Sequence, residues 1–263
     1  MTLDLHVTLT YDMEVPTDIL LQVEAAAIPE QRIESAHIQA SHCDHFVRVA
    51  ALDGIGDRIW LRTSGRLSID YRARMTVLRD LADVATLPQM PLHQLPGETV
   101  QYLFDSHYCP ATKFHSFVDT EFGALSGGAR IAAMQSWIAE HFTYQSGSSD
   151  ATTTALDSFV TRHGVCRDYA HVMIVLARAC SIPARFASVY APDVTPQDFH
   201  AVAEVFLANP DGAGGAWHLV DPTGMATAAD MVKIGVGRDA LDVAFLTAFG
   251  TVELVEQQVS VKR

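Results

Sequence analysis

The first stretch of the chain alternates apolar and polar residues, and this alternation restricts the fold more than any other feature. In "LDLHVTLTYDM" every second residue is apolar, namely Leu3, Leu5, Val7, Leu9, Tyr11 and Met13. A period of two places such residues on one face of a β-strand. The pattern returns in "DILLQVEA" (18–25) and on both sides of "TSGR" (63–66), where we expect a hairpin around Gly65. Strands at this spacing predict an antiparallel sheet or sandwich.

The proline-rich stretch 86–97 marks a change in periodicity, and we place a domain boundary there. We expect a β-rich N-terminal domain over 1–85, a linker over 86–100 and a second domain over 101–263. The second domain begins with helical spacing, and we expect helices over 128–144, 150–164 and 166–180. Strands are expected afterwards over 184–191, 200–207, 216–222 and 252–263. The predicted fold class is therefore α+β.

Composition and charge exclude several classes of protein. The chain has 263 residues, 49 % of them hydrophobic and 19 % charged, as in globular proteins. A net charge of −13 argues against nucleic acid or an anionic membrane as the main partner. The N-terminal residues lack the features of a secretory signal, and the longest apolar run is too short to span a bilayer. Four cysteines without a CxxC pair do not indicate disulfides, so we expect a cytoplasmic protein with reduced thiols.

One cysteine stands where a thiol gains reactivity. Cys166 lies in "GVCRDYAH" (164–171), between a glycine turn and the apolar run of the third expected helix. Unpaired N–H groups at a helix N-terminus favour a thiolate over a thiol, and the same groups can bind the oxyanion of a tetrahedral intermediate. A buried structural cysteine is the alternative that this segment alone leaves open.

Two distant residues complete a reactive set. His200 begins one expected strand and Asp221 ends the next, and the turn-rich "ANPDGAGG" between these strands favours a hairpin. In an antiparallel hairpin the first residue of one strand lies near the last residue of the other. We therefore expect Asp221 to orient the imidazole of His200, which leaves the second ring nitrogen for a proton from sulfur.

The three motifs in this order resemble a known family. "GVCRDYAHVMIVLARACSIPARFAS", "DFHAVAEVFL" and "WHLVDPTG" are similar to the transglutaminase-like superfamily, particularly to its bacterial branch of candidate cysteine proteases. The resemblance covers about residues 100–250, and "GVGRDALDVAF" (235–245) and the β-rich N-terminal region are also similar to that branch. It implies a papain-like core, with a cysteine at a helix N-terminus packed on an antiparallel sheet. It places the nucleophile, base and orienting carboxylate on Cys166, His200 and Asp221. Many members carry a tryptophan where this chain has Val202, from which we expect altered cleft walls and retained reactivity.

Four further residues are weaker candidates for binding substrate or the oxyanion. Tyr108 could donate a hydrogen bond in the cleft, although a structural role is the preferred interpretation. Arg167 and Asp168 could tune the charge of the nucleophile, or Asp168 could serve the start of the helix. Glu204 could bind substrate, steady His200 or take part in a buried ion pair. The cluster "SHCDHF" (41–46) contains side chains that zinc accepts, but such close neighbours on an extended strand cannot converge on one ion.

These residues predict a thiol-dependent acyl-transfer enzyme that acts on a peptide or protein substrate. Hydrolysis of a peptide or amide bond is the preferred reaction, partly because the resemblance favours it. Transfer of the acyl group to an amine, as in a transglutaminase, needs the same three residues and stays open. A catalytically silent binding module on the same fold is the alternative from another class. No metal ion or organic cofactor is implied, and a homo-oligomer is compatible with the sequence.

Overall fold

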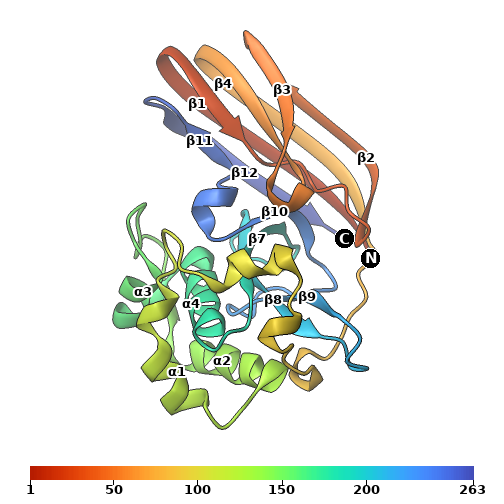
Figure 1. The fold of residues 1–263 in the computed structure, drawn as a ribbon. Helices are drawn as coiled ribbons and strands as arrows, with labels where there is room; N and C mark the ends of the chain where they lie inside the picture. The colour runs from red at the N-terminus through yellow and green to blue at the C-terminus, as the bar shows by residue number, and fades with distance from the viewer.

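The computed structural model describes residues 1–263 and arranges them in layers (Figure 1). A large antiparallel sheet of six strands forms one layer, a four-stranded antiparallel sheet forms the next, and helices cover the far side of the smaller sheet. The strands of the large sheet are β1 (Thr2–Leu21), β2 (Gln31–Ala40), β3 (His45–Ala50), β4 (Asp57–Val77), β11 (Leu246–Ala248) and β12 (Glu253–Lys262). The α+β class is confirmed.

The two longest strands correct the expected hairpin at Gly65. β4 passes through Gly65 without reversing, and its two halves pair with the two halves of β1 rather than with each other. The register between β1 and β4 shifts between Met13 and Thr17, and Gly65 there adopts a φ of +74°. Glycine takes such angles without steric cost, so this position gives a bend inside a strand pair. Apolar residues on both sides of the bend share one core.

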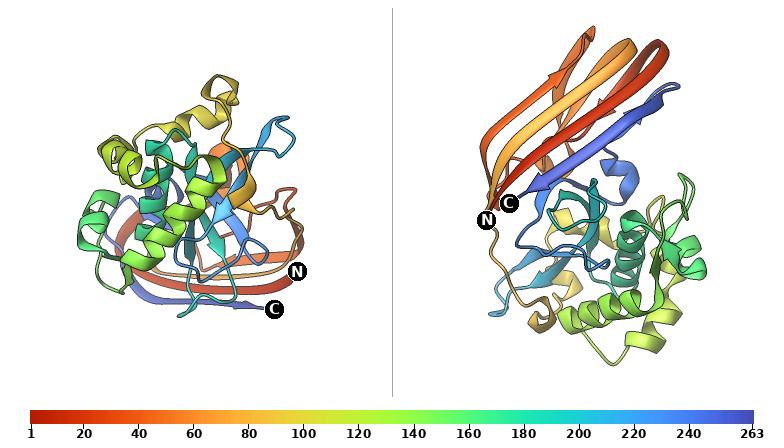
Figure 2. Two further views of the ribbon diagram at one scale, coloured as in Figure 1. Left: turned by 90° about the horizontal axis from the view of Figure 1, so that it is seen from below. Right: turned by 180° about the vertical axis from the view of Figure 1, so that it is seen from behind.

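The C-terminal strands correct the expected domain boundaries. β11 and β12 both pair with β1, so residues 246–262 belong to the large sheet and not to the second domain. The pairing of Asp4 with Lys262 brings the two termini together, which Figures 1 and 2 show from three sides. The chain thus leaves the first sheet, builds the second unit and returns. A cut near residue 85 would separate β1 from two of its partners.

The smaller sheet has the strand order β10-β7-β8-β9. The expected strands are confirmed as β7 (Ala184–Tyr190), β8 (His200–Ala208) and β9 (Gly215–Val220). The sequence prediction missed β10 (Val232–Gly237), all of whose residues are buried. Its apolar residues alternate with Lys233 and two glycines, residue types that are uncommon in strands and weaken the pattern. A short parallel pair, β5 (Thr143–Tyr144) with β6 (His163–Gly164), lies beside the helices.

Four α-helices cover the smaller sheet: α1 (His115–Phe122), α2 (Gly127–His141), α3 (Ala155–Thr161) and α4 (Cys166–Ala179). The expected helices are confirmed as α2, α3 and α4. Thr154 caps α3, and that helix ends at Arg162, which adopts a φ of 62°, rather than at Gly164. None of the helices has the length and hydropathy that crossing a membrane requires.

Short 3₁₀ helices occupy the connecting segments. They are Leu52–Gly54, Val84–Thr86, Leu92–Gln94, Gly97–Leu103, Ala111–Lys113 and Ala240–Val243. The segment expected to be a linker over 86–100 is thus built largely of such turns. Gly128 in α2 packs so closely on one of these turns that a Cβ would lie 1.6 Å from the carbonyl oxygen of Val84.

A buried ion cluster joins the two sheets. The carboxylate of Glu204 on β8 accepts hydrogen bonds from Arg185 on β7 at 2.7 Å and from Lys233 on β10 at 2.6 Å. Arg185 also pairs with Asp53, and Lys233 with Glu30, which both precede β4 in the chain. Although burial alone would raise the pKa of Glu204, its two cationic neighbours lower it to about 2. The carboxylate therefore stays charged and holds three strands together.

Replacing Glu204 tests this cluster. The substitution Glu204→Gln leaves Lys233 and Arg185 with less opposing charge in a buried place, and we expect the free energy of unfolding to fall by about 3 kcal/mol. Urea denaturation measures the change. Glu253→Gln, at an exposed position of β12, is the matched control and is expected to stay within about 0.5 kcal/mol of wild type. An equally small change for Glu204→Gln would contradict the role given to the cluster.

Candidate active site

The turn before α4 fixes the position of Cys166. Cys166 is the first residue of the helix and is half-buried. Oδ2 of Asp168 accepts hydrogen bonds from the backbone N–H of Val165 at 2.8 Å and from the hydroxyl of Ser149 at 2.7 Å. A Cβ on Gly164 would lie 2.5 Å from the Cβ of Asp168, so this close approach requires glycine. The sulfur therefore sits at the positive end of a well-capped helix.

His200 and Asp221 meet at the same end of the smaller sheet. β8 and β9 are antiparallel, and Nε2 of His200 lies 3.0 Å from Oδ2 of Asp221. The carboxylate also accepts hydrogen bonds from the N–H and hydroxyl of Thr223 and from the N–H of Ala226. These donors hold it in place and, with His200, lower the pKa of Asp221 although burial opposes them.

The remaining ring nitrogen of His200 is available for proton exchange. Nδ1 is buried and has no hydrogen-bond partner. The neighbouring sulfur of Cys166 contributes to the raised pKa of the ring. Burial lowers the pKa of His200, but the hydrogen bond to Asp221 and the proximity of Cys166 outweigh it and raise the pKa to about 9. Asp221 and Cys166 thus favour a proton on the imidazole at neutral pH. The structure brings Cys166, His200 and Asp221 together as the sequence predicts.

A cleft opens beside the sulfur. It has a volume of about 260 Å³, and both Cys166 and His200 line it. Phe186 and Ser188 on β7 contribute to its walls, as do Phe199 and residues 240, 241 and 243–245. No aspartate or glutamate lines it. A substrate carbonyl can reach the sulfur from this side.

Tyr144 is a site residue that the sequence analysis did not identify. It lies on β5, paired with Gly164 in the turn that precedes Cys166. Burial and the adjacent sulfur raise the pKa of Tyr144 to about 12, although hydrogen bonding from the backbone N–H of Cys166 opposes the rise. The phenol is therefore protonated at neutral pH and lies against both the sulfur and the first amide of α4. In the sequence, only its position between "HF" (141–142) and the serine-rich "QSGSSD" (145–150) indicates that it lies near a turn.

Two of the weaker candidates lie at the cleft but have structural partners. The hydroxyl of Tyr108 donates a hydrogen bond to the carbonyl of Ala151 at 2.8 Å, so it is not free to bind an oxyanion. Its ring lines the cleft and stacks on His171. The guanidinium of Arg167 donates to the carbonyl of Asp150 and lies over the Tyr108 ring. Both residues therefore shape the wall of the cleft.

The other weak candidates lie outside the cleft. Asp168 serves the start of α4, and Glu204 belongs to the buried ion cluster, so neither carboxylate faces substrate. In the segment 41–46, His42 pairs loosely with Asp44 at 3.7 Å, and these side chains form no cluster with metal-binding geometry.

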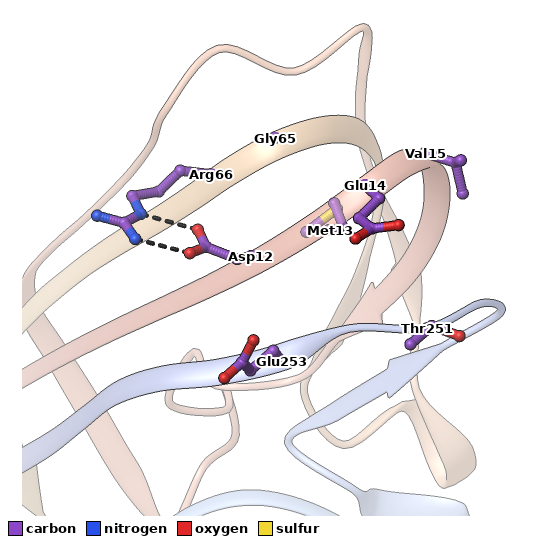
Figure 3. A pocket seen from close by; sticks show the side chains of 8 residues that line it. All are labelled: Asp12, Met13, Glu14, Val15, Gly65, Arg66, Thr251 and Glu253. Atoms are coloured by element: carbon purple, nitrogen blue, oxygen red, sulfur yellow. Dashed lines mark hydrogen bonds and ion pairs between the residues drawn. The ribbon is translucent and has the colours of Figure 1, made fainter.

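A larger hollow lies far from Cys166, at the bend of the large sheet (Figure 3). It has a volume of about 580 Å³ and is lined by Asp12, Met13, Glu14, Val15, Gly65, Arg66, Thr251 and Glu253. Asp12 and Arg66 are bound to each other through two hydrogen bonds. The lining offers no nucleophile with a neighbouring base, so the smaller cleft at Cys166 is the candidate active site.

Comparison with known proteins identifies the family. The sequence model of the transglutaminase-like superfamily matches residues 118–222. The crystal structure of a candidate cysteine protease from Cytophaga hutchinsonii is similar over 100 % of this chain and 90 % of its own, with 30 % sequence identity and a TM-score of 0.90. The chain belongs to the transglutaminase-like superfamily. Its transglutaminase-like core contains all three residues of the candidate site.

Curated relatives match a smaller share of the chain. An uncharacterised protein of Mycobacterium leprae, ML0607, is 28 % identical over 120 residues, which cover 43 % of this chain and 42 % of the relative. The uncharacterised protein Rv2569c of Mycobacterium tuberculosis is 33 % identical over 112 residues, which cover 39 % of this chain and 35 % of the relative. The matched segment thus spans less than half the length of either relative.

The link between His200 and Asp221 can be tested by titration. In Asp221→Asn the negative charge that favours the imidazolium is lost while burial still disfavours it, so we expect the pKa of His200 to fall from about 9 to below its ordinary value. NMR of ¹³C-labelled histidine rings measures this pKa. Asp230→Asn is the control, because Asp230 is a similarly buried carboxylate that binds Arg263 instead of a histidine. A His200 pKa that stays near 9 in Asp221→Asn would show that the carboxylate does not set it.

Proposed function

We propose that this protein is a thiol-dependent acyl-transfer enzyme that hydrolyses a peptide or amide bond, with Cys166 as nucleophile. The observation that supports it best is the buried imidazole of His200, which is bound through Nε2 to Asp221 and has Nδ1 unpaired beside the sulfur. A packing histidine would not need a raised pKa, a fixed carboxylate and an unpaired nitrogen next to a thiol. The family supports an enzyme of papain-like fold.

The residues divide the reaction as follows. Nδ1 of His200 takes the proton of the Cys166 thiol, and the thiolate attacks the substrate carbonyl to form a C–S bond. The resulting oxyanion lies near the helix N-terminus, where the N–H of Cys166 can donate to it. The C–N bond then breaks, and the imidazolium gives its proton to the leaving amine. Water, deprotonated by His200, attacks the thioester, releases the carboxylic acid and restores the thiol.

Hydrolysis fits the cleft better than transfer to an amine. A lysine side chain that approaches as a second substrate is cationic at neutral pH and would be held by a carboxylate near the sulfur. No acidic residue lines the cleft, and the only formally cationic side chain besides His200 is Arg167. Water needs no binding site of its own and reaches the half-buried sulfur directly. Transglutaminase activity is therefore the second choice.

Tyr144 supplies a hydrogen-bond donor at the place where the oxyanion forms. Its hydroxyl lies against the N–H of Cys166, and its high pKa keeps the proton in place. When a substrate carbonyl oxygen accepts a hydrogen bond from the N–H of Cys166, the hydroxyl of Tyr144 can rotate and donate a second hydrogen bond to the same oxygen. This role, which the sequence could assign only weakly to Tyr108, suits Tyr144 because Tyr108 is bound to Ala151.

Removing the hydroxyl of Tyr144 tests this part of the proposal. Loss of one oxyanion donor costs about 100-fold in turnover in comparable enzymes, and we expect Tyr144→Phe to lower kcat by about that factor with little change in KM. Tyr108→Phe is the matched control and should change kcat far less. The rate of release of p-nitrophenol from an acyl-amino-acid ester measures both. Equal losses in the two variants would contradict the assignment.

Thiol labelling tests the proposal as a whole. An imidazolium and a helix N-terminus both favour the thiolate, which is the form that reacts, so we expect iodoacetamide to modify Cys166 at pH 6 about tenfold or more faster than Cys43. His200→Ala should remove most of this advantage while the melting temperature stays near that of wild type. Peptide mapping by mass spectrometry gives the rate at each cysteine. Buried Cys109 serves as an internal control for unfolding. Slow labelling of Cys166 that does not depend on His200 would contradict the proposal and indicate a catalytically silent binding module.

A further inference from the structure

The walls of the cleft beside Cys166 are almost entirely apolar. Apart from Arg167, Ser188 and His200, its lining consists of Tyr108, Cys166, Phe186, Phe199, Ala201, Ala240, Leu241, Val243, Ala244 and Phe245. Such residues normally pack into a core, yet here they border a space of about 260 Å³ next to the reactive groups. This volume accommodates one large side chain and little more.

Aromatic stacking and a backbone hydrogen bond hold the cleft open. The rings of Phe199 and Phe245 stack with centroids 4.6 Å apart and an angle of 6° between their planes. Phe199 also contacts Tyr190, which is fully buried between the sheets. The carbonyl of Phe245 accepts a hydrogen bond from the N–H of Gln22, which ties this wall to the large sheet. The apolar surface is therefore preformed and does not need to be assembled around a ligand.

Charge inside the cleft disfavours ionic occupants. The guanidinium of Arg167 donates to the backbone carbonyl of Asp150, lies over an aromatic ring and has the carboxylate of Asp168 at 3.8 Å as its counter-charge. His200 is paired with Asp221. A carboxylate or ammonium group that entered would lose its hydration without gaining a free partner of opposite charge. An aliphatic or aromatic group would lose only its ordered water.

We propose that this cleft is a specificity subsite, which holds a bulky apolar side chain of a peptide substrate next to the carbonyl that Cys166 attacks. Residues of the size of leucine, methionine or phenylalanine fill it. This inference rests on the proposed function and extends it to a substrate class. Phe245 and Leu241 determine the specificity, Phe245 as a stacked wall and Leu241, which is 56 % exposed, as part of the rim. The large sheet thus takes part in substrate choice through the segment that leads into β11.

Chloromethyl ketones of acetylated amino acids test the subsite without a known substrate. The thiolate of Cys166 displaces chloride from such a reagent, so that a C–S bond forms as the C–Cl bond breaks, and the amino-acid side chain occupies the neighbouring subsite. For each variant, the rate of modification is divided by the rate with iodoacetamide, which reports the reactivity of the sulfur alone. We expect the phenylalanine and leucine reagents to react at least about tenfold faster than the aspartate and glycine reagents by this measure.

Two variants and a control make the result specific. Phe245→Ala should reduce the preference for the phenylalanine reagent several-fold, and Leu241→Asp, at an exposed position that tolerates charge, should reduce it independently. Phe249→Ala is the control, because Phe249 is a largely exposed phenylalanine near the same strand that lies outside the cleft. Equal normalised rates for all four reagents, or an unchanged preference in both variants, would overturn the subsite while leaving the proposed function intact. Labelling by iodoacetamide that is slow and independent of His200 would overturn both.

Discussion

Strand β8 is held between neighbours on every side, and the rest of the molecule depends on that placement. It pairs with β7 and β9, α4 packs against it, and every one of its residues is buried. The same strand begins with His200 and carries Glu204 in its middle. Its apolar residues therefore fix the register, while Glu204 and His200 have separate roles. Glu204 binds the cations that join the sheets, and His200 meets Asp221 where β9 ends. A shift of one residue along β8 would break both contacts at once.

The candidate site combines three electrostatic arrangements with separate causes. Cys166 lies at the positive end of α4, whose start is fixed by the hydrogen bond from the N–H of Val165 to Asp168. Asp221 is held by hydrogen bonds from Thr223 and Ala226 and keeps its charge. His200 lies between Cys166 and Asp221, and its pKa is higher than that of an ordinary histidine. The apolar cleft next to them excludes competing charges, which strengthens each of these interactions.

Much of this arrangement could be predicted from local patterns, and the rest depends on contacts between distant residues. The boundaries of α4 follow from a glycine turn, an apolar run and the nearby Pro183, all within twenty residues. The meeting of His200 with Asp221 follows from a short hairpin. By contrast, the sequence around Gly65 predicts a hairpin where the structure has a bend, because a glycine between two alternating runs fits a turn as well as a bulge. β10 has only a weak strand pattern, because a lysine and two glycines alternate with its apolar residues although both of its faces are covered. Tyr144 and Phe245 reach the site only through the pairing of β5 with β6 and the return of the chain to the large sheet, which no local pattern reveals.

The proposed function requires a covalent acyl-enzyme intermediate at Cys166. Mixing the protein with the p-nitrophenyl ester of N-acetyl-leucine and following p-nitrophenol on the millisecond scale measures it. We expect a rapid burst of about one equivalent per chain, and a protein whose mass has increased by one acyl group at Cys166 when the reaction is quenched with acid. The added mass should disappear as hydrolysis proceeds. Release of p-nitrophenol without a burst, and with no acyl group on Cys166, would contradict the account.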